Sequence, residues 1–196
     1  MNYKPMREYS HEEFVNLVLG LNEEQLLELS SKYGGYPVLF RMSLDERLSH
    51  IPFIQTGSSV VVRDENGRIL LQQRADNGMW GLPGGCQELG EDLRSTAVRE
   101  LFEETGLKVK EGDLILIDTV SGSRRRKVYP NGDIVYNNCS LYLVDVDSRN
   151  QIRKDSESVQ LKFFDINELP ESIMDDDLID EYIKFLLTIR NTTAGL

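Results

Sequence analysis

The strongest constraint on this sequence is the stretch from residue 85 to residue 107, where a glycine-rich turn runs directly into an acidic segment. Residues 92–104 contain no proline or glycine and predict a helix, and Gly106 follows where a C-cap glycine belongs. Glycines reach backbone conformations that other residues avoid. A loop is therefore predicted before the helix, at Gly81, Pro83, Gly84, Gly85 and Gly90.

Three carboxylates share one face of this predicted helix. At about 100° of turn per residue, Glu100, Glu103 and Glu104 fall within a sector of about 100°. Each like-charged pair costs a few tenths of a kcal/mol, roughly, and a divalent cation among the three would relieve that repulsion. Arg99 lies one turn before Glu103 and can pair with it. The alternative to a metal site is that the three glutamates form an acidic helix face that is simply solvated. An apolar stripe is predicted beside them, formed by Ala97, Val98, Leu101 and Phe102.

The full spacing of this stretch carries more information than its glutamates alone. It reads Gly, five residues, Glu, seven residues, Arg-Glu-Leu, one residue, Glu-Glu, one residue, Gly-Leu. This pattern resembles the signature of the Nudix hydrolases at every fixed position, and the preceding residues 80–85 also resemble that family. The resemblance covers roughly residues 54–190 and implies an α/β fold: a Nudix-like α/β/α sandwich with a mixed central sheet.

The resemblance also implies a metal-dependent chemistry. Mg²⁺ neutralises a polyphosphate and orients water, and it prefers oxygen ligands in octahedral geometry. Carried over from the family, the ligands are the Gly85 carbonyl and the carboxylates of Glu100, Glu103 and Glu104, with Mn²⁺ as an alternative ion. Arg99 would then orient Glu103 rather than touch the substrate.

The general base remains open from sequence. Glu100 or Glu103 can take the proton of the attacking water, whereas some members of the family use a glutamate from a later loop. Glu157, just before a predicted strand, is the favoured candidate of that kind, and Asp155 is its weaker rival. A solvated loop acid is the alternative interpretation of Glu157.

Other residues are candidates for substrate binding. Arg74 ends a predicted strand near the glycine loop, where a guanidinium can hold a phosphate bidentately. Residues 124–127 are the only cationic run and can gather an anionic substrate. Tyr129 and Tyr136 flank an Asn-Gly turn and can stack on a base. In each case a surface or packing role is the alternative.

Composition excludes several classes of function. The net charge of −11 disfavours nucleic acid and anionic membranes, and no run approaches 18 apolar residues. The first residues lack an apolar signal region, and two cysteines, Cys86 and Cys139, are too few for a disulfide scaffold. A cytoplasmic protein with reduced thiols is expected, with no nucleic-acid or membrane partner.

The chain divides into a helical N-terminal extension, residues 1–50, and a Nudix hydrolase domain, residues 51–196. Ser10 and Asn22 are predicted to cap two helices in the extension, with a third near residues 43–50. These helices must pack on the domain or on another subunit, as in a homodimer. In the domain, strands are expected at 54–62, 68–74, 114–119, 134–146 and 159–164, and a closing helix at 176–189.

The expected function is Mg²⁺-dependent hydrolysis of a pyrophosphate bond in a nucleoside diphosphate linked to another moiety, such as ADP-ribose or a related nucleotide sugar or alcohol. One alternative is a house-cleaning pyrophosphohydrolase of nucleoside triphosphates. A second, of another class, is a non-catalytic nucleotide-sensing domain, which the complete set of motif glutamates disfavours.

Overall fold

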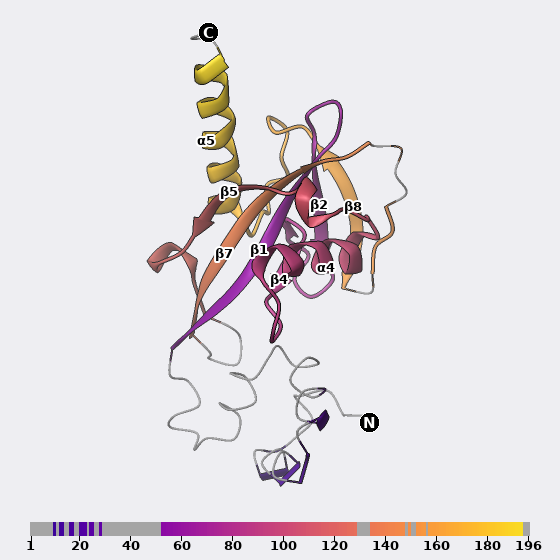
Figure 1. Ribbon diagram of the computed structural model, residues 1–196, viewed down its shortest axis with the longest axis vertical. Coiled ribbons are helices and arrows are strands. Elements are labelled where there is room, and N and C mark those ends of the chain that lie inside the picture. The colour runs from indigo at the N-terminus through magenta and orange to yellow at the C-terminus, as the bar shows by residue number, and fades with distance from the viewer. Residues whose placement is uncertain are drawn as a thin grey trace.

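The structure is a computed structural model of the 196-residue chain. In its Nudix-like part it describes residues 52–128, 134–147, 149, 152–155 and 157–193, and in the first fifty residues it describes positions 10, 12, 13, 16, 17, 20–22, 24, 25 and 28. Figure 1 shows a strongly twisted sheet with α4 lying across it and α5 rising at one end.

The sheet is mixed, as predicted. Its single parallel pair among the described strands joins β1 (Phe53–Arg63) to β7 (Ile134–Asp145), and all other pairs are antiparallel. The remaining strands are β2 (Ile69–Arg74), β3 (Trp80–Gly81), β4 (Gly84–Cys86), β5 (Ile115–Val120), β6 (Arg126–Val128) and β8 (Ser158–Phe164). The helices are α4 (Leu93–Thr105), α5 (Asp176–Thr193) and the 3-10 turns η2 (Glu111–Asp113) and η3 (Ser123–Arg125).

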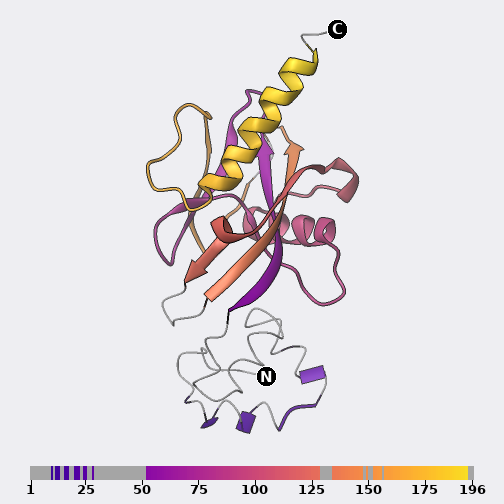
Figure 2. The same ribbon diagram turned by 90° about the vertical axis from the view of Figure 1, so that its left-hand side faces the viewer.

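Helices cover both faces of the sheet, which confirms the predicted sandwich. Neighbouring residues of β1 divide between two cores: Val61 packs in the cluster that contains Leu178 of α5, and Val60 in the cluster that contains Leu101 of α4. Figure 2 shows α5 on the opposite side of the sheet from α4. Because both faces are covered, β2 buries consecutive apolar residues instead of alternating.

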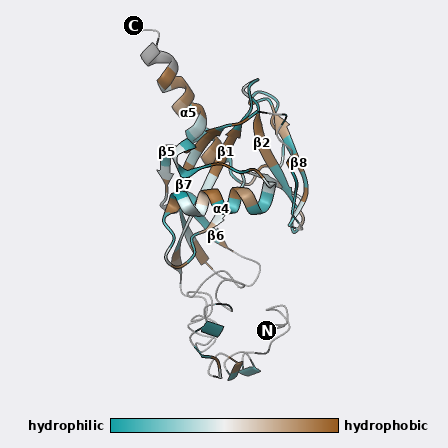
Figure 3. Ribbon diagram, turned by 45° about the vertical axis from the view of Figure 1, so that its right-hand side comes forward, coloured by the Kyte–Doolittle hydropathy of each residue, from teal (hydrophilic) through white to brown (hydrophobic). Residues whose placement is uncertain are grey.

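Helix α4 begins and ends where the sequence places it. The Asp92 carboxylate accepts hydrogen bonds from the N–H groups of Arg94 (2.8 Å) and Ser95 (2.9 Å). Gly106, at φ 73°, ends the helix with its N–H donating to the Phe102 carbonyl. The alternating hydropathy along α4 is visible in Figure 3.

One residue of the predicted apolar stripe is placed differently. Ala97 and Leu101 are fully buried and Val98 packs against them, but Phe102 is 42% exposed, with the Lys108 ammonium over its ring. Phe102 is about 100° around the helix from Leu101, and this rotation turns it off the buried face.

The glycine segment is more ordered than a loop, so that prediction is corrected. It contains the short strands β3 and β4, and β4 pairs antiparallel with β1. A Cβ at Gly84, where φ is 152°, would collide with the Ser58 carbonyl, and a Cβ at Gly57 would collide with the Gly85 carbonyl. These glycines allow β4 to lie closely against β1.

Residues 121–128 contain η3 and the strand β6, which pairs with β7. The Asn131-Gly132 turn lies outside the described residues. Helix α5 runs from Asp176, as expected, and extends to Thr193. Among the described helices, none has the length and apolar character needed to span a membrane.

The two N-terminal caps are confirmed locally. The Ser10 and Glu13 pair exchanges hydrogen bonds between side chain and backbone N–H at 2.9 and 3.2 Å. Asn22 and Gln25 do the same at 3.0 Å in each direction. The third predicted helix, residues 43–50, lies outside the described residues, and the division into an extension and a domain stays a prediction.

Candidate active site

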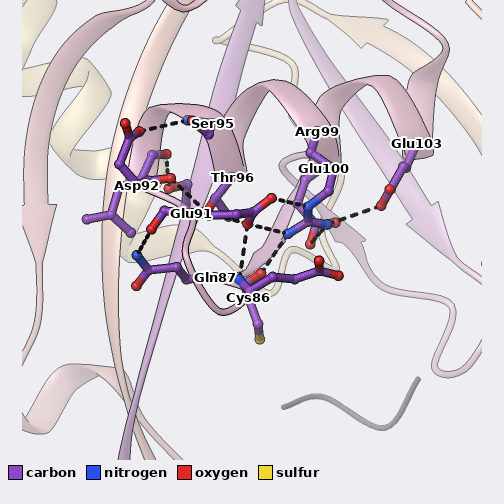
Figure 4. A network of polar contacts seen from close by, with 12 residues as sticks. Cys86, Gln87, Glu91, Asp92, Ser95, Thr96, Arg99, Glu100 and Glu103 are labelled. Atoms are coloured by element: carbon purple, nitrogen blue, oxygen red, sulfur yellow. Dashed lines mark hydrogen bonds and ion pairs between the residues drawn. The ribbon is translucent and has the colours of Figure 1, made fainter. Parts of the chain in front are cut away.

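Arg99 is the centre of the polar network in Figure 4. Its Nε and Nη2 hold the two carboxylate oxygens of Glu91 at 2.7 and 3.0 Å, and Nη2 also donates to the Cys86 carbonyl at 2.9 Å. Its Nη1 donates to Glu100 at 2.9 Å and to Glu103 at 3.2 Å. Arg99 thus fixes the glycine segment to the helix and positions two motif carboxylates, beyond the single Glu103 contact predicted.

Glu91 is the functional residue whose role the sequence reasoning missed. The guanidinium of Arg99 holds the Glu91 pKa at about 2, and Thr96 Oγ1 (2.9 Å) and the Glu88 N–H (3.0 Å) also donate to it. Glu91 precedes the helix, so a helical projection could not place it beside Arg99. Its fixed spacing of eight residues before Arg99 in the motif was the available signal.

Glu104 is the most deeply buried of the three helix carboxylates, 6% exposed. Burial raises the pKa of Glu104 to about 8. Hydrogen bonds from the Gln72 side chain and the Gly84 N–H lower this pKa, and the nearby Glu100 and Asp155 carboxylates raise it. The Gly84 N–H lies 2.8 Å from Glu104 Oε2. The helix therefore directs a carboxylate inward against the glycine segment, where its negative charge is poorly compensated.

Glu100 and Glu103 differ from Glu104 and from each other. Burial raises the pKa of Glu100, an effect that the hydrogen bond from Arg99 opposes. A Cβ at Gly85 would collide with the Glu100 carboxylate, so only glycine lets the main chain of β4 approach it. The Glu103 side chain is 55% exposed. The three carboxylates on this helix face thus differ in exposure, from the buried Glu104 to the exposed Glu103.

These groups fit a hard divalent cation in chemistry. The half-buried Glu100 and the buried Glu104 both have raised pKa values and touch a glycine main chain, so they form an oxygen-rich site. Within the described residues, however, no three acidic, histidine or cysteine side chains form a preassembled metal site. The ligand set Gly85, Glu100, Glu103 and Glu104 therefore stays a proposal.

A cavity of about 660 Å³ opens beside β4. Gly84, Gly85 and Cys86 line it. Burial raises the Cys86 pKa to about 11, so this thiol is a poor nucleophile. Both cysteines are free: Cys139 is buried, and its thiol lies 3.3 Å from Ser59 Oγ as a donor.

Arg74 lies on the same cavity wall, as its predicted role requires. Its guanidinium is already held by Asp76, at 3.0 Å from Nε and 3.1 Å from Nη2. That hydrogen-bonded partner raises the Arg74 pKa. A phosphate would have to share or displace Asp76 to be held bidentately.

The base candidates lie at the edge where β2 pairs with β8. The Ala75 N–H donates to the Glu157 carbonyl at 2.8 Å, and the exposed Glu157 carboxylate is close enough to Arg74 to contribute to the rise of its pKa. Asp155 accepts hydrogen bonds from the N–H groups of Glu157 (3.0 Å) and Ser158 (3.1 Å). Neither carboxylate lines the cavity among the described residues.

Of the two candidate tyrosines, the structure describes only Tyr136. Tyr129 lies outside the described residues. Tyr136 is half-buried on β7 and does not line the cavity, although its neighbours Asn137 and Asn138 do. Stacking of a base on these rings stays a prediction.

The cationic run is divided by the fold. Arg124 pairs with Glu181 at 2.9 Å on the surface, whereas Arg125 is buried beside Asp177. Lys127 lines the cavity with Arg125. A sequence run of like charges could not show which members would turn inward.

Residues 54–186 match the NUDIX domain family. Together with the sandwich fold and the Arg99 network of the motif, this match shows that the chain belongs to the Nudix hydrolase family, the family of Nudix-type pyrophosphohydrolases. Both the predicted family and the predicted class of enzyme are confirmed.

Individual relatives agree with this assignment. The chain is 40% identical over 77 residues to a MutT-like protein of Streptomyces ambofaciens, covering 39% of this chain and half of that protein. It is 31% identical over 128 residues to an ADP-ribose pyrophosphatase of Methanocaldococcus jannaschii, covering 62% of this chain and 69% of the relative. The solved E. coli dihydroneopterin triphosphate pyrophosphohydrolase has a TM-score of 0.54 at 26% identity, covering 68% and 95% of the two chains.

Proposed function

We propose that this chain hydrolyses the pyrophosphate bond of a nucleoside diphosphate linked to another moiety, with ADP-ribose or a related nucleotide sugar or alcohol as substrate. The observation that carries the proposal is the packing of two motif carboxylates, the half-buried Glu100 and the buried Glu104, against the β4 main chain at the edge of a substrate-sized cavity. The relative named as an ADP-ribose pyrophosphatase supports this class of substrate.

Mg²⁺ is the proposed cofactor, with Mn²⁺ as the alternative. The Gly85 carbonyl and the carboxylates of Glu100, Glu103 and Glu104 would hold it. When bound, it supplies the positive charge that a polyphosphate and these buried carboxylates both need. Arg99 is a positioning residue, because its donors are occupied by Glu91, by two motif glutamates and by a main-chain carbonyl.

The protein groups then divide the remaining work. A water attacks one phosphorus of the pyrophosphate while the bond to the bridging oxygen breaks, and a carboxylate takes the proton of that water. Glu157 is the proposed base; it requires a movement of its loop toward the cavity. Glu100 is the next candidate. Arg74 is proposed to contact a phosphate at the cavity wall, in exchange for part of its contact with Asp76.

The second candidate function is pyrophosphohydrolysis of a nucleoside triphosphate. It is favoured by the similarity to a solved triphosphate pyrophosphohydrolase. A chromatographic product screen over ADP-ribose, nucleotide sugars, dinucleotides and triphosphates, with Mg²⁺ and with EDTA, separates the two, because the first reaction gives two phosphate monoesters and the second gives a nucleoside monophosphate and pyrophosphate. Turnover of triphosphates alone would move the function to the second candidate. If neither the parent nor the Glu104→Gln variant turned over any substrate, hydrolysis would be refuted altogether.

The expected setting follows from charge. The net charge of −11 and the free cysteines support a cytoplasmic protein that acts on a small nucleotide and has no nucleic-acid or membrane partner. Packing of the N-terminal extension on the Nudix domain, or across a homodimer, completes the proposal.

A further inference from the structure

The cavity contains more positive charge than the hydrolytic site uses. Three cationic side chains line it among the described residues: Arg74, Arg125 and Lys127. Arg74 is engaged with Asp76, and Arg99 lies outside the lining, engaged with carboxylates. In a chain of net charge −11, Arg125 and Lys127 therefore remain to be explained; they share this part of the lining with the carboxylate of Asp175.

Arg125 is a buried cation whose donors are incompletely used. It is 6% exposed, and its Nη1 donates to Asp177 at 2.8 Å, while the Asp175 carboxylate is farther away at 3.6 Å. Its Nε has no hydrogen-bond partner, nor does Oδ2 of Asp177. Buried polar groups are normally satisfied, and an arginine can donate five hydrogen bonds. The fold thus holds a guanidinium in the cavity wall by one firm contact and leaves its buried Nε without a partner.

Lys127 adds a second positive charge next to Arg125. Its ammonium has no ion pair or hydrogen bond within the described part of the chain, yet it lies near enough to Asp175 to oppose the rise of that carboxyl's pKa caused by burial. Asp175 itself is bound to the glycine segment, since the Leu82 N–H donates to it at 3.3 Å. Asp175 and Asp177 therefore hold the cavity wall in place, and the Lys127 ammonium can contact a ligand.

These cations are carried by η3 and β6, whereas the hydrolytic carboxylates contact β4. Gly57 of β1 is paired with Cys86 of β4 on one side and with Cys139 of β7 on the other, and β7 in turn pairs with β6. The backbones of β4 and β6 are thus separated by three strand spacings, no more than about 14 Å across a curled sheet. A cavity of about 660 Å³ has room for a diphosphate and a further ring-sized group between them.

The lining defines the chemistry of that further group. No aromatic ring lines the cavity among the described residues. The lining here presents the two cations, the amides of Asn137 and Asn138 and the carboxylate of Asp175. Guanidinium, ammonium and amide donors together suit carboxylate or phosphate oxygens.

We propose that Arg125 and Lys127 form an anion subsite for a carboxylate or phosphate carried one ring away from the scissile pyrophosphate. The inference rests on the proposed function and narrows its substrate class: the preferred substrate has an additional anionic group. That group can belong to the moiety linked to the nucleoside diphosphate or to the ribose of the nucleoside, and the two sources are separable by experiment.

The test compares matched substrates that differ in one anionic group. UDP-glucuronate against UDP-glucose varies the linked sugar, and 2′-phospho-ADP-ribose against ADP-ribose varies the nucleoside. The full-length parent should show kcat/KM at least about tenfold higher for the anionic member of one pair, which is the factor expected for one charge-assisted hydrogen bond. The pair that shows the preference identifies the source.

Variants decide whether these two residues cause the preference. Lys127→Gln should raise KM for the anionic substrate about tenfold and leave the neutral substrate within about twofold, with kcat nearly unchanged. Arg125→Lys should reduce the preference while keeping the charge. Lys184→Gln makes the same change of net charge on α5, at an exposed ion pair with Glu181, and should leave the preference intact.

Binding gives an independent readout. Calorimetric Kd values of the EDTA-treated parent for UDP-glucuronate, UDP-glucose and the ADP-ribose pair should show the same ratio without turnover. Equal Kd values within both substrate pairs would overturn the subsite. A preference for the anionic substrate that is unchanged in the Lys127→Gln and Arg125→Lys variants would overturn it as well. Failure to hydrolyse any substrate would instead refute the proposed function, and the Kd ratios would still decide the subsite.

Discussion

Replacement of Glu104 by Gln should stabilise the metal-free protein while it removes activity. The parent must keep a carboxyl with a pKa of about 8 in a site where it is 6% exposed. Below the ordinary pKa of 4.5 this carboxyl is neutral in both folded and unfolded chains. As the pH rises from 4.5 to 8, the unfolded chain ionises and the folded chain does not, so the parent steadily loses stability. At pH 7 the loss is about 3 kcal/mol.

The Gln variant avoids this loss. Its amide oxygen can still accept the hydrogen bond from the Gly84 N–H. In a domain of this size 1 kcal/mol corresponds to about 2–4 °C in Tm, so the variant should unfold about 6–12 °C higher at pH 7 in EDTA. The difference should vanish near pH 4.5, and Mg²⁺ should narrow it at pH 7 by stabilising the parent alone. Thermal unfolding by circular dichroism from pH 4.5 to 8 measures all three effects.

Glu103→Gln is the matched control. The Glu103 side chain is 55% exposed, and its 3.2 Å contact with Arg99 should contribute less than about 1 kcal/mol. A Glu104→Gln variant that melts at or below the parent temperature in EDTA at pH 7 would refute the reasoning. A pH-independent difference would refute it equally, because the stabilisation would then not come from the ionisation of Glu104.

Four further predictions concern the motif glutamates, the general base, the Glu91–Arg99 ion pair and the N-terminal extension. Glu103→Gln or Glu104→Gln should cut turnover by several orders of magnitude with folding intact by circular dichroism; near-normal turnover would remove that residue from the metal site. Glu157→Gln should lower turnover about 10²–10⁴-fold at saturating Mg²⁺ with metal affinity retained; turnover within about threefold of the parent would favour Glu100 as the base, to be tested by Glu100→Gln. Glu91→Gln should cost about 2 kcal/mol in urea unfolding at pH 7, and this contribution should be lost as the pH falls from 4.5 toward 2; an unchanged midpoint would show that Arg99 is held without Glu91. Deletion of residues 1–50 should lower Tm or change the sedimentation mass; an equally stable monomer would make the extension a loose appendage.

Local signals in the sequence predict the main elements well. The Asp92 and Gly106 caps fix α4, and the short apolar runs Val60–Val62 and Leu141–Val144 mark β1 and β7, because these elements depend on neighbouring residues. The short strands β3, β4 and β6 escape prediction. Strand β4 exists through pairing with the earlier strand β1, where Gly57 pairs with Cys86, whereas β3 and β6 pair with their sequence neighbours β2 and β7. Their two or three residues carry too little pattern to be recognised alone.

The candidate site shows the same division. Helical periodicity places Glu100, Glu103 and Glu104 on one face, yet it cannot show that Glu104 is buried and Glu103 exposed. That difference depends on where β4 meets the helix, through a glycine approach that only tertiary structure reveals. The burial of Arg125 depends likewise on Asp177, 52 residues away.

The parallel pairing of β1 with β7 has a consequence for synthesis of the chain. The eleven paired positions are separated by 82 residues, so β1 leaves the ribosome long before its partner. At about 5–20 residues per second, the interval is about 4–16 s. During that time the apolar segment Val60–Val62 has one open edge, which invites chaperone binding or misassembly. The glycine segment and α4, made in between, cannot reach their final geometry until β7 arrives, so catalytic competence comes late in translation.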